Sequence, residues 1–108
     1  MANTFKREEL LLTASFATIY TCPALTTAIV IGMRMANIDG GNEVNCEVKI
    51  GQSGSTFYHT GVATPIPIGS ALKGIEAEKI VLEAGDIIEA KAGAINDVDM
   101  SISIMEIT

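Results

Sequence analysis

Strict alternation of apolar and polar side chains is the feature that most constrains this sequence. Apolar residues occupy every second position from Val44 to Ile50, from Ile88 to Ala92 and from Val98 to Ile104. In a β-strand, successive side chains point to opposite faces, so this spacing places the apolar groups on one face. Each of the three segments is therefore predicted to be a strand with one face on a core and the other in water.

Turn-forming residues punctuate the chain about every ten residues, which is the spacing of a sandwich or jelly roll. Residues 39–42 are expected to form a hairpin loop, and residues 52–55, 83–86 and 93–97 further tight connections. Crossover helices that would link parallel strands are missing from the pattern. The sequence therefore predicts an all-β fold, a single antiparallel β-sandwich or jelly roll of about eight strands, in one domain over residues 1–108.

Other segments have a less clear pattern. Residues 8–15 fit a strand or a helix because their leucines are contiguous, and a strand is favoured because β-prone sequence follows closely. Pro65–Ile68 is expected to be an edge or extended segment, since a proline cannot donate to a sheet ladder. Residues 70–78 are the only plausible site for a helical turn, which Gly74 weakens. Residues 1–5 are expected to form a flexible N-terminal arm.

Charge and composition exclude several classes of partner. The chain has 108 residues, a formal net charge of −6 and 48% hydrophobic residues. Net negative charge repels phosphate backbones and anionic lipids, so we expect no nucleic acid and no membrane among its partners. The longest apolar run, Ala28–Ile31, is far shorter than the roughly 18 residues of a membrane-spanning helix. No signal peptide is visible. The two cysteines do not resemble a disulfide framework, which predicts synthesis in a reducing cytoplasm.

The residues that most often carry chemistry are few and scattered. His59 is the only histidine, and the sequence indicates neither a nucleophile nor an orienting partner for it. Cys22 precedes a proline, and Cys46 lies on the apolar face of a predicted strand, where burial would raise its pKa. Asn and Asp side chains crowd residues 37–43, where turn formation is favoured over calcium binding because the EF-hand spacing is missing. We therefore expect no enzymatic activity, no cofactor and no metal site.

Several strand-and-turn phrases carry a resemblance to a known group of proteins. They are Tyr20–Ala24 leading into Thr26–Val30, Met35–Gly40, Lys79–Ile88 and Val98–Thr108. In these phrases the chain resembles small virion structural proteins of tailed bacteriophages, in particular head-decoration (cement) proteins. The resemblance implies a β-sandwich or jelly-roll subunit, often a homotrimer, that binds the outer surface of the head and stabilises the shell. It also implies a virion location after synthesis in the host bacterial cytoplasm, with the major capsid protein or another virion protein as a partner.

The segment Thr27–Asn37 is rich in Ile, Val and Met, and it is either buried on both faces or faces a neighbouring subunit. Apolar residues of this segment and of the proline-rich segment, together with one in the arm, are the candidate contacts with other subunits or with the capsid. They are Phe5, Ile29, Ile31, Met33, Met35, Pro65, Ile66, Pro67 and Ile68. The alternative for each of them is that it fills the chain's own core. Residues 1–12 match nothing in the phage group.

Three other functions stay open. The chain is alternatively a tail, neck or fibre-base virion protein, a carbohydrate-binding β-sandwich module, or an enzyme subunit whose active site forms between chains. The sequence has no Trp and two Tyr. This weakens the carbohydrate-binding alternative, because sugar-binding platforms normally need more aromatic area.

Overall fold

The structure, a computed structural model, describes residues 3–52, 54–61, 63–75 and 79–108. Over these ranges it is all-β, with ten strands and no helix, which confirms the predicted fold class. The strands are β1 (Asn3–Leu11), β2 (Ala17–Thr21), β3 (Thr27–Asn37), β4 (Val44–Gln52), β5 (Ser55–Tyr58), β6 (Thr64–Ile66), β7 (Ala71–Ile75), β8 (Ile80–Leu82), β9 (Asp86–Ala92) and β10 (Val98–Ile107). A helix long and apolar enough to cross a membrane is not found among the described residues.

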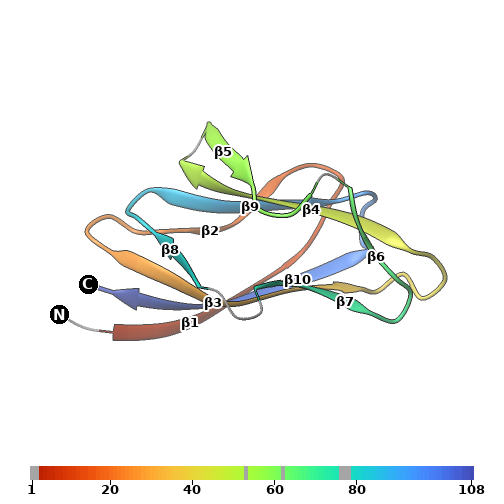
Figure 1. The fold of residues 1–108 in the computed structure, drawn as a ribbon, viewed down its shortest axis with the longest axis horizontal. Helices are drawn as coiled ribbons and strands as arrows, with labels where there is room; N and C mark the ends of the chain where they lie inside the picture. The colour runs from red at the N-terminus through yellow and green to blue at the C-terminus, as the bar shows by residue number, and fades with distance from the viewer. Residues whose placement is uncertain (1–2, 53, 62, 76–78) are drawn as a thin grey trace.

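Two antiparallel sheets form the two layers of the molecule (Figure 1). The first, which we call sheet A, has the strand order β1-β10-β3-β7, and β8 also pairs with β3. The second, sheet B, has the order β2-β9-β4-β5, and β6 also pairs with β4. The prediction of about eight strands is corrected to ten. The reason is that β7 and β8 pair with different parts of β3, and β5 and β6 with different parts of β4.

The alternating segments line the interior between the sheets, as their pattern predicts. Their inward side chains on β10, β9 and β4 are nearly all buried. The buried members are Val44, Cys46, Val48, Ile88, Ala90, Ala92, Val98, Met100, Ile102 and Ile104. Ile50, the last apolar residue of the β4 pattern, is half-buried and packs against this cluster.

A β-bulge in β3 changes which of its residues face the core. The pairing between β3 and β10 shifts register between Ser103 and Ile104 of β10, and Ile31 of β3 is left out of it. Val30 is buried before the bulge and Met33 after it. Because the extra residue moves the alternation by one place, the odd-numbered residues of β3 do not all lie on one face.

Strand pairing corrects three further expectations. Residues 39–42 do not close a hairpin, because they lead from β3 in sheet A to β4 in sheet B. The expected helical turn over residues 70–78 is replaced by β7 at residues 71–75, and residues 76–78 lie outside the described ranges. Within the expected arm, residues 3–5 instead pair with β10, and residues 1–2 are outside the description. The tight connection expected at residues 52–55 joins β4 to β5, which pair as a hairpin.

Candidate assembly surface

The residue types that carry catalysis or bind metals are dispersed over the described part of the chain. No three His, Cys, Asp or Glu side chains among the described residues gather where they could hold a metal ion. His59 follows β5, and its backbone N–H donates to the Val48 carbonyl at 2.7 Å. Apolar and charged side chains on the surface are therefore the remaining candidates for a functional site.

Both cysteines are free thiols in the interior. Cys22 and Cys46 are each 1% exposed, and neither forms a disulfide. Burial raises the pKa of the Cys46 thiol to about 11, which confirms the effect expected from its place on an apolar strand face. Burial also raises the pKa of the Cys22 thiol, which donates to the Thr26 carbonyl at 3.4 Å. Thiols that stay protonated in the interior are poor nucleophiles.

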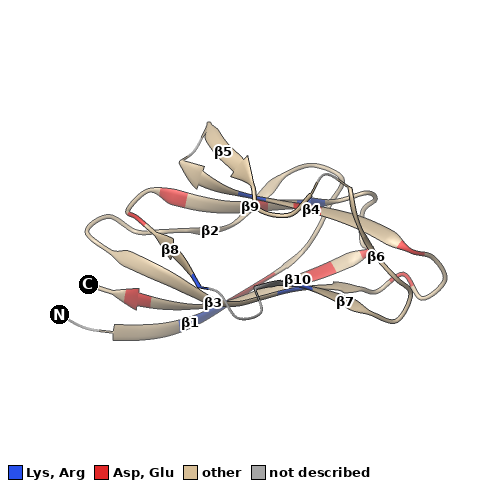
Figure 2. Cartoon of the chain, viewed as in Figure 1, with Lys and Arg blue, Asp and Glu red and all other residues tan. Residues whose placement is uncertain are grey.

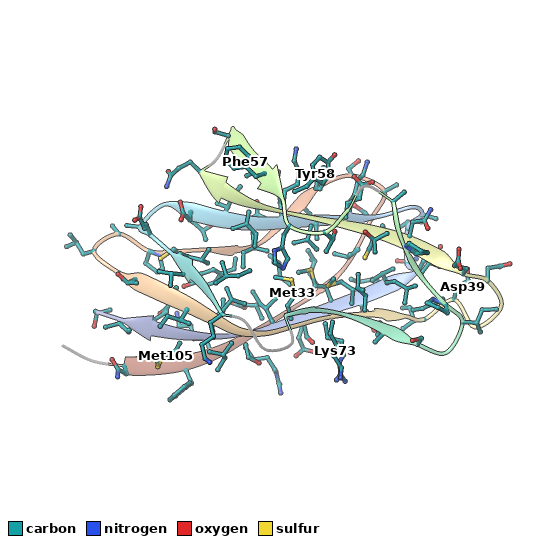
Figure 3. The ribbon with its side chains drawn as sticks, in the orientation of Figure 1. Met33, Asp39, Phe57, Tyr58, Lys73 and Met105 are labelled. Atoms are coloured by element: carbon teal, nitrogen blue, oxygen red, sulfur yellow. The ribbon has the colours of Figure 1, made fainter. Side chains whose placement is uncertain are left out.

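The Asn- and Asp-rich loop between β3 and β4 uses its side chains to hold its own shape. Asn37 Nδ2 donates to the carbonyls of Asn42 and Ile66, at 2.9 and 3.1 Å. Asn37 Oδ1 accepts from the Asp39 N–H at 2.8 Å, and Asp39 Oδ1 accepts from the Gly41 N–H at 3.2 Å. Figure 3 places Asp39 at one end of the sandwich. Such side chain to backbone bonds are those of Asx turns, which favours the turn role over calcium binding.

One buried carboxylate links the two sheets. Glu106 of β10 is 6% exposed and takes the inward position that Ile104 takes two residues earlier. It accepts a hydrogen bond from the Tyr20 hydroxyl of β2 and forms an ion pair with Lys6 of β1 at 3.2 Å. The Tyr20 hydrogen bond, assisted by Lys6, holds the pKa of the Glu106 carboxyl below its usual value. Burial, and then this same bond, raise the pKa of the Tyr20 hydroxyl.

An apolar row crosses the outer face of sheet A, the face turned away from sheet B. Phe5 of β1 lies opposite Met105 of β10. Met105 lies opposite Ile29 of β3, which in turn lies opposite Val81 of β8. Phe5 and Val81 are 71% and 61% exposed, and the two residues between them are partly exposed. We call these four residues the outer apolar row; Figure 3 shows Met105 on the outer side of the lower layer.

The rest of this outer face becomes polar away from the row. Ile107 and Ile31, both partly exposed, border the row on β10 and β3. Farther along β1, Arg7 Nε lies 3.3 Å from Glu9 Oε1. Arg34 of β3 follows on the same face, opposite a serine of β10 and a lysine of β7. The apolar row is therefore a local patch with a charged border.

The outer face of sheet B carries a cluster of charged and aromatic side chains that contact one another. The Lys49 ammonium of β4 lies over the rings of Phe16 and Tyr58, at 5.1 and 5.0 Å from their centroids. Lys91 of β9 lies 5.1 Å from the Phe16 centroid and forms an ion pair with Glu47 at 3.7 Å. Figure 2 shows basic and acidic positions on β4 and β9 in this layer. These side chains are thus partnered within the chain.

The bulge in β3 separates the predicted contact residues of that strand. Met33 and Met35 are at most 4% exposed and fill the chain's own core; Figure 3 shows Met33 between the two layers. A partner cannot reach them in this structure. Ile29 and Ile31 lie on the outer face instead, and Ile29 joins Phe5 in the outer apolar row.

The proline-rich segment lies at an edge of sheet B, far from the row in the pairing order. Pro65 and Ile66 belong to β6, which pairs with β4 as an edge strand. Ile66 is fully buried, whereas Pro65 and Pro67 are exposed and Ile68 is 57% exposed. The predicted contact residues therefore do not form one continuous surface.

Met105, Val81 and Glu106 are features of the surface and interior that the sequence interpretation missed. Met105 carried a usable signal, because it continues the polar phase that Ser101 and Ser103 set in the same strand. An apolar residue in a solvent-facing phase is a candidate contact. Val81 carried none, since its strand spans Ile80–Leu82 and is too short to show a period.

Comparisons with known proteins identify the fold alone. No family model and no curated protein matches the chain. A solved structure of Bacillus endospore appendages, described as a novel family of disulfide-linked pili, contains a chain of similar fold. It has a TM-score of 0.54 and 14% identity, with 97% of this chain and 84% of that chain covered. The acidic stable capsid of a Helicobacter pylori bacteriophage contains another, with a TM-score of 0.55, 13% identity, and coverage of 98% and 87%.

Proposed function

We propose that this chain is a structural protein of a phage virion, and specifically a subunit that decorates the outer surface of a capsid and stabilises the shell. The observation that carries the proposal is the outer apolar row on sheet A. It is an exposed apolar patch with Arg7 next along β1 and Arg34 farther along β3, and such patches mark surfaces that bind another protein.

The row is large enough to anchor a protein contact. Neighbouring strands lie about 4.8 Å apart, so a row over four strands is roughly 14 Å wide. Phe5 at 71% exposure and Val81 at 61% keep most of their apolar area for a partner. Burial contributes about 25 cal/mol per Å², and repeated copies on a lattice multiply a modest contact through avidity.

The comparisons support an assembling subunit over an isolated enzyme or binding module. Both structural neighbours come from assemblies, one a phage capsid and the other a set of pili. The capsid is the better precedent for this chain, because the pili are described as disulfide-linked. Here Cys22 and Cys46 are 1% exposed, so neither thiol can reach another subunit without rearrangement.

The strand order supports the jelly-roll form of the sandwich. The first strand pairs with the last in sheet A, and the second pairs with the last but one in sheet B. The chain passes between the sheets at β1–β2, β2–β3, β3–β4, β6–β7, β8–β9 and β9–β10. Pairing of the first strands with the last, together with these crossings between sheets, is consistent with two interlocked Greek keys.

Binding to undecorated phage heads tests the proposal. The wild-type chain is expected to pellet with the heads and to raise the temperature at which they release DNA. Phe5→Ser combined with Val81→Ser should weaken binding by at least about tenfold, because truncated anchor residues typically cost more than about 1 kcal/mol each. Phe57→Ser is the matched control, since Phe57 is 75% exposed but belongs to sheet B.

Two results would contradict the decoration role. One is no co-sedimentation with heads at any concentration; the other is equal binding by the double variant and the wild type. A tail, neck or fibre-base position predicts few copies per particle, whereas decoration predicts hundreds, so counting copies in purified virions separates these two alternatives. A glycan array tests the carbohydrate-binding alternative on the same protein.

A further inference from the structure

Strand β1 is a long, unprotected edge of sheet A. It spans Asn3–Leu11 and pairs with β10 on one side. On its other side it pairs with no strand among the described residues. A free edge of this length presents a row of backbone donors and acceptors that another strand can pair with.

The backbone groups at this free edge belong to the odd-numbered residues. The Leu12 N–H donates to the Val98 carbonyl at 2.9 Å, directly after the register that pairs Leu11 with Asp99. Hydrogen-bonded and non-hydrogen-bonded pairs alternate along an antiparallel ladder. Even-numbered residues of β1 therefore bond to β10, and odd-numbered ones direct their N–H and C=O groups outward.

Side chains of the same odd-numbered residues lie on the outer face of sheet A. In order they are apolar, basic, acidic and apolar: Phe5, Arg7, Glu9 and Leu11. Phe5 and Leu11 are 71% and 43% exposed, and the Arg7 and Glu9 side chains are 74% and 67% exposed. Residues at equal distances from Glu8 complement each other. Phe5 and Leu11 are both apolar, and Arg7 and Glu9 carry opposite charges.

We propose that β1 pairs with β1 of a second copy of this chain, antiparallel and in the register centred on Glu8. In that register Phe5 lies opposite Leu11 of the other copy, and Arg7 lies opposite Glu9. The two-fold axis repeats both pairs, so the outer face gains two apolar contacts and two opposite-charge contacts. Such cross-strand pairs are the unit by which antiparallel sheets are stabilised.

Other registers lose this complementarity. Keeping the outer faces aligned requires residues of the same parity to face each other. A register centred on Arg7 sets two arginines face to face and pairs Phe5 with Glu9. A register centred on Glu9 sets two glutamates face to face and pairs Arg7 with Leu11. On the outer face, charge and apolarity together therefore favour the register centred on Glu8.

On the inner face, the same register sets the half-buried Glu8 opposite its own copy. Lys6 of each chain lies diagonal to that pair, and its own ion pair with Glu106 stays on the β10 side. Charges on an edge strand normally deter chance pairing with unrelated strands. Here the outer-face charges match those of a second copy of β1, and the opposed Glu8 pair is the unfavourable contact of this register.

The paired chains would form one continuous sheet whose two outer apolar rows face the same side. The Phe5 residues of the two copies lie at opposite ends of the shared ladder. They are separated along it by six residues, or roughly 20 Å at 3.4 Å per residue. The pairing is independent of the capsid proposal, and it is two-fold, whereas the phage resemblance implies a trimer. Failure to bind heads would leave it intact.

Disulfide trapping tests the register. In the full-length protein, Glu8→Cys should form a covalent dimer on mild oxidation, because opposed residues of a non-hydrogen-bonded pair have Cα atoms about 4.5 Å apart, within disulfide range. Arg7→Cys is the matched control and should form no covalent dimer under the same conditions, because residue 7 lies opposite residue 9 of the other copy. Cross-linking of Arg7→Cys but not Glu8→Cys would overturn the register.

Charge exchange tests the pairing itself by sedimentation at low salt. Arg7→Glu and Glu9→Arg should each weaken self-association by at least about tenfold, because both symmetric pairs become like-charged. A mixture of these two variants should form mixed dimers, and the double variant R7E/E9R should self-associate again. Lys73→Glu on β7, at the far edge of sheet A, should have little effect, and circular dichroism checks that each variant is folded.

A wild-type chain that stays monomeric at about 100 μM would overturn the pairing. So would a trimer whose association none of the charge changes affects. Restoration of dimers by mixing the two single variants cannot arise from a general loss of folding, so that outcome would support direct contact between residues 7 and 9.

Discussion

The two outer faces of the sandwich differ in how far their exposed side chains are partnered within the chain. On sheet B, Lys49 and Lys91 lie over the Phe16 ring, and Lys91 also pairs with Glu47. On sheet A, the outer apolar row from Phe5 to Val81 ends in solvent at both edges. These side chains of sheet B are partnered within the chain, and the row on sheet A leaves apolar area exposed to solvent.

If the outer apolar row binds a partner as proposed, exposure alone does not identify a contact surface. Tyr58 on sheet B is 49% exposed, yet its ring has Lys49 over it. Phe5 and Val81 are also exposed, and strand pairing aligns them with other apolar residues across the sheet. Continuity across strands, rather than any single exposed residue, separates a binding surface from an ordinary one.

The largest expected effect on stability comes from the interior between the two sheets, where Tyr20 and Glu106 are hydrogen-bonded. Tyr20→Phe should destabilise the chain by about 1.5–3 kcal/mol at pH 7, the usual contribution of a hydrogen bond to a charged group. Chemical denaturation of both proteins measures it. Tyr20 and Glu106 join the two sheets, so the loss of stability should affect the whole sandwich. A loss of structure confined to one sheet would contradict this expectation.

The same pair predicts an acid dependence. Since the pKa of Glu106 is lowered in the folded state, its stabilisation is present above the usual value of 4.5 and is lost as pH falls through the lower folded value. The cost of Tyr20→Phe should therefore shrink below that pH. A cost that shrinks at no pH below 4.5 at which the protein stays folded would show that the carboxylate is not the acceptor.

A smaller effect is expected on the outer face of sheet B. Phe16→Ala should lower the free energy of unfolding by about 1–2 kcal/mol, because it removes two cation–π contacts of about 0.5–1 kcal/mol each. Phe57→Ala, at a 75% exposed ring, is the control and should stay within about 0.5 kcal/mol. Equal effects of the two substitutions would remove the distinction between the faces.

The smallest effect on stability is expected in the outer apolar row. Phe5→Ala should change the free energy of unfolding by less than about 0.5 kcal/mol, because 71% of that residue is in solvent. Thermal denaturation of the dilute protein measures this. A loss of 2 kcal/mol or more would mean that the row serves the chain's own fold rather than a partner.

Prediction from sequence succeeded where the pattern is local and failed where it depends on pairing. The alternation from Val98 to Ile104 correctly indicated which side chains are buried. Ile29 and Met33 appeared to share a face, but the bulge at Ile31 places them on opposite faces. The loop at residues 39–42 had hairpin composition, and no local signal shows that its flanking strands belong to different sheets.

By itself, the sequence determined the fold class, the inward faces of the regular strands and the order of charges along β1, because a period of two is a property of neighbouring residues. Only the tertiary structure decided that Phe5, Met105, Ile29 and Val81 form one row. Residues so far apart in sequence are aligned by hydrogen-bond register, and register is settled by which inward side chains pack together in the core.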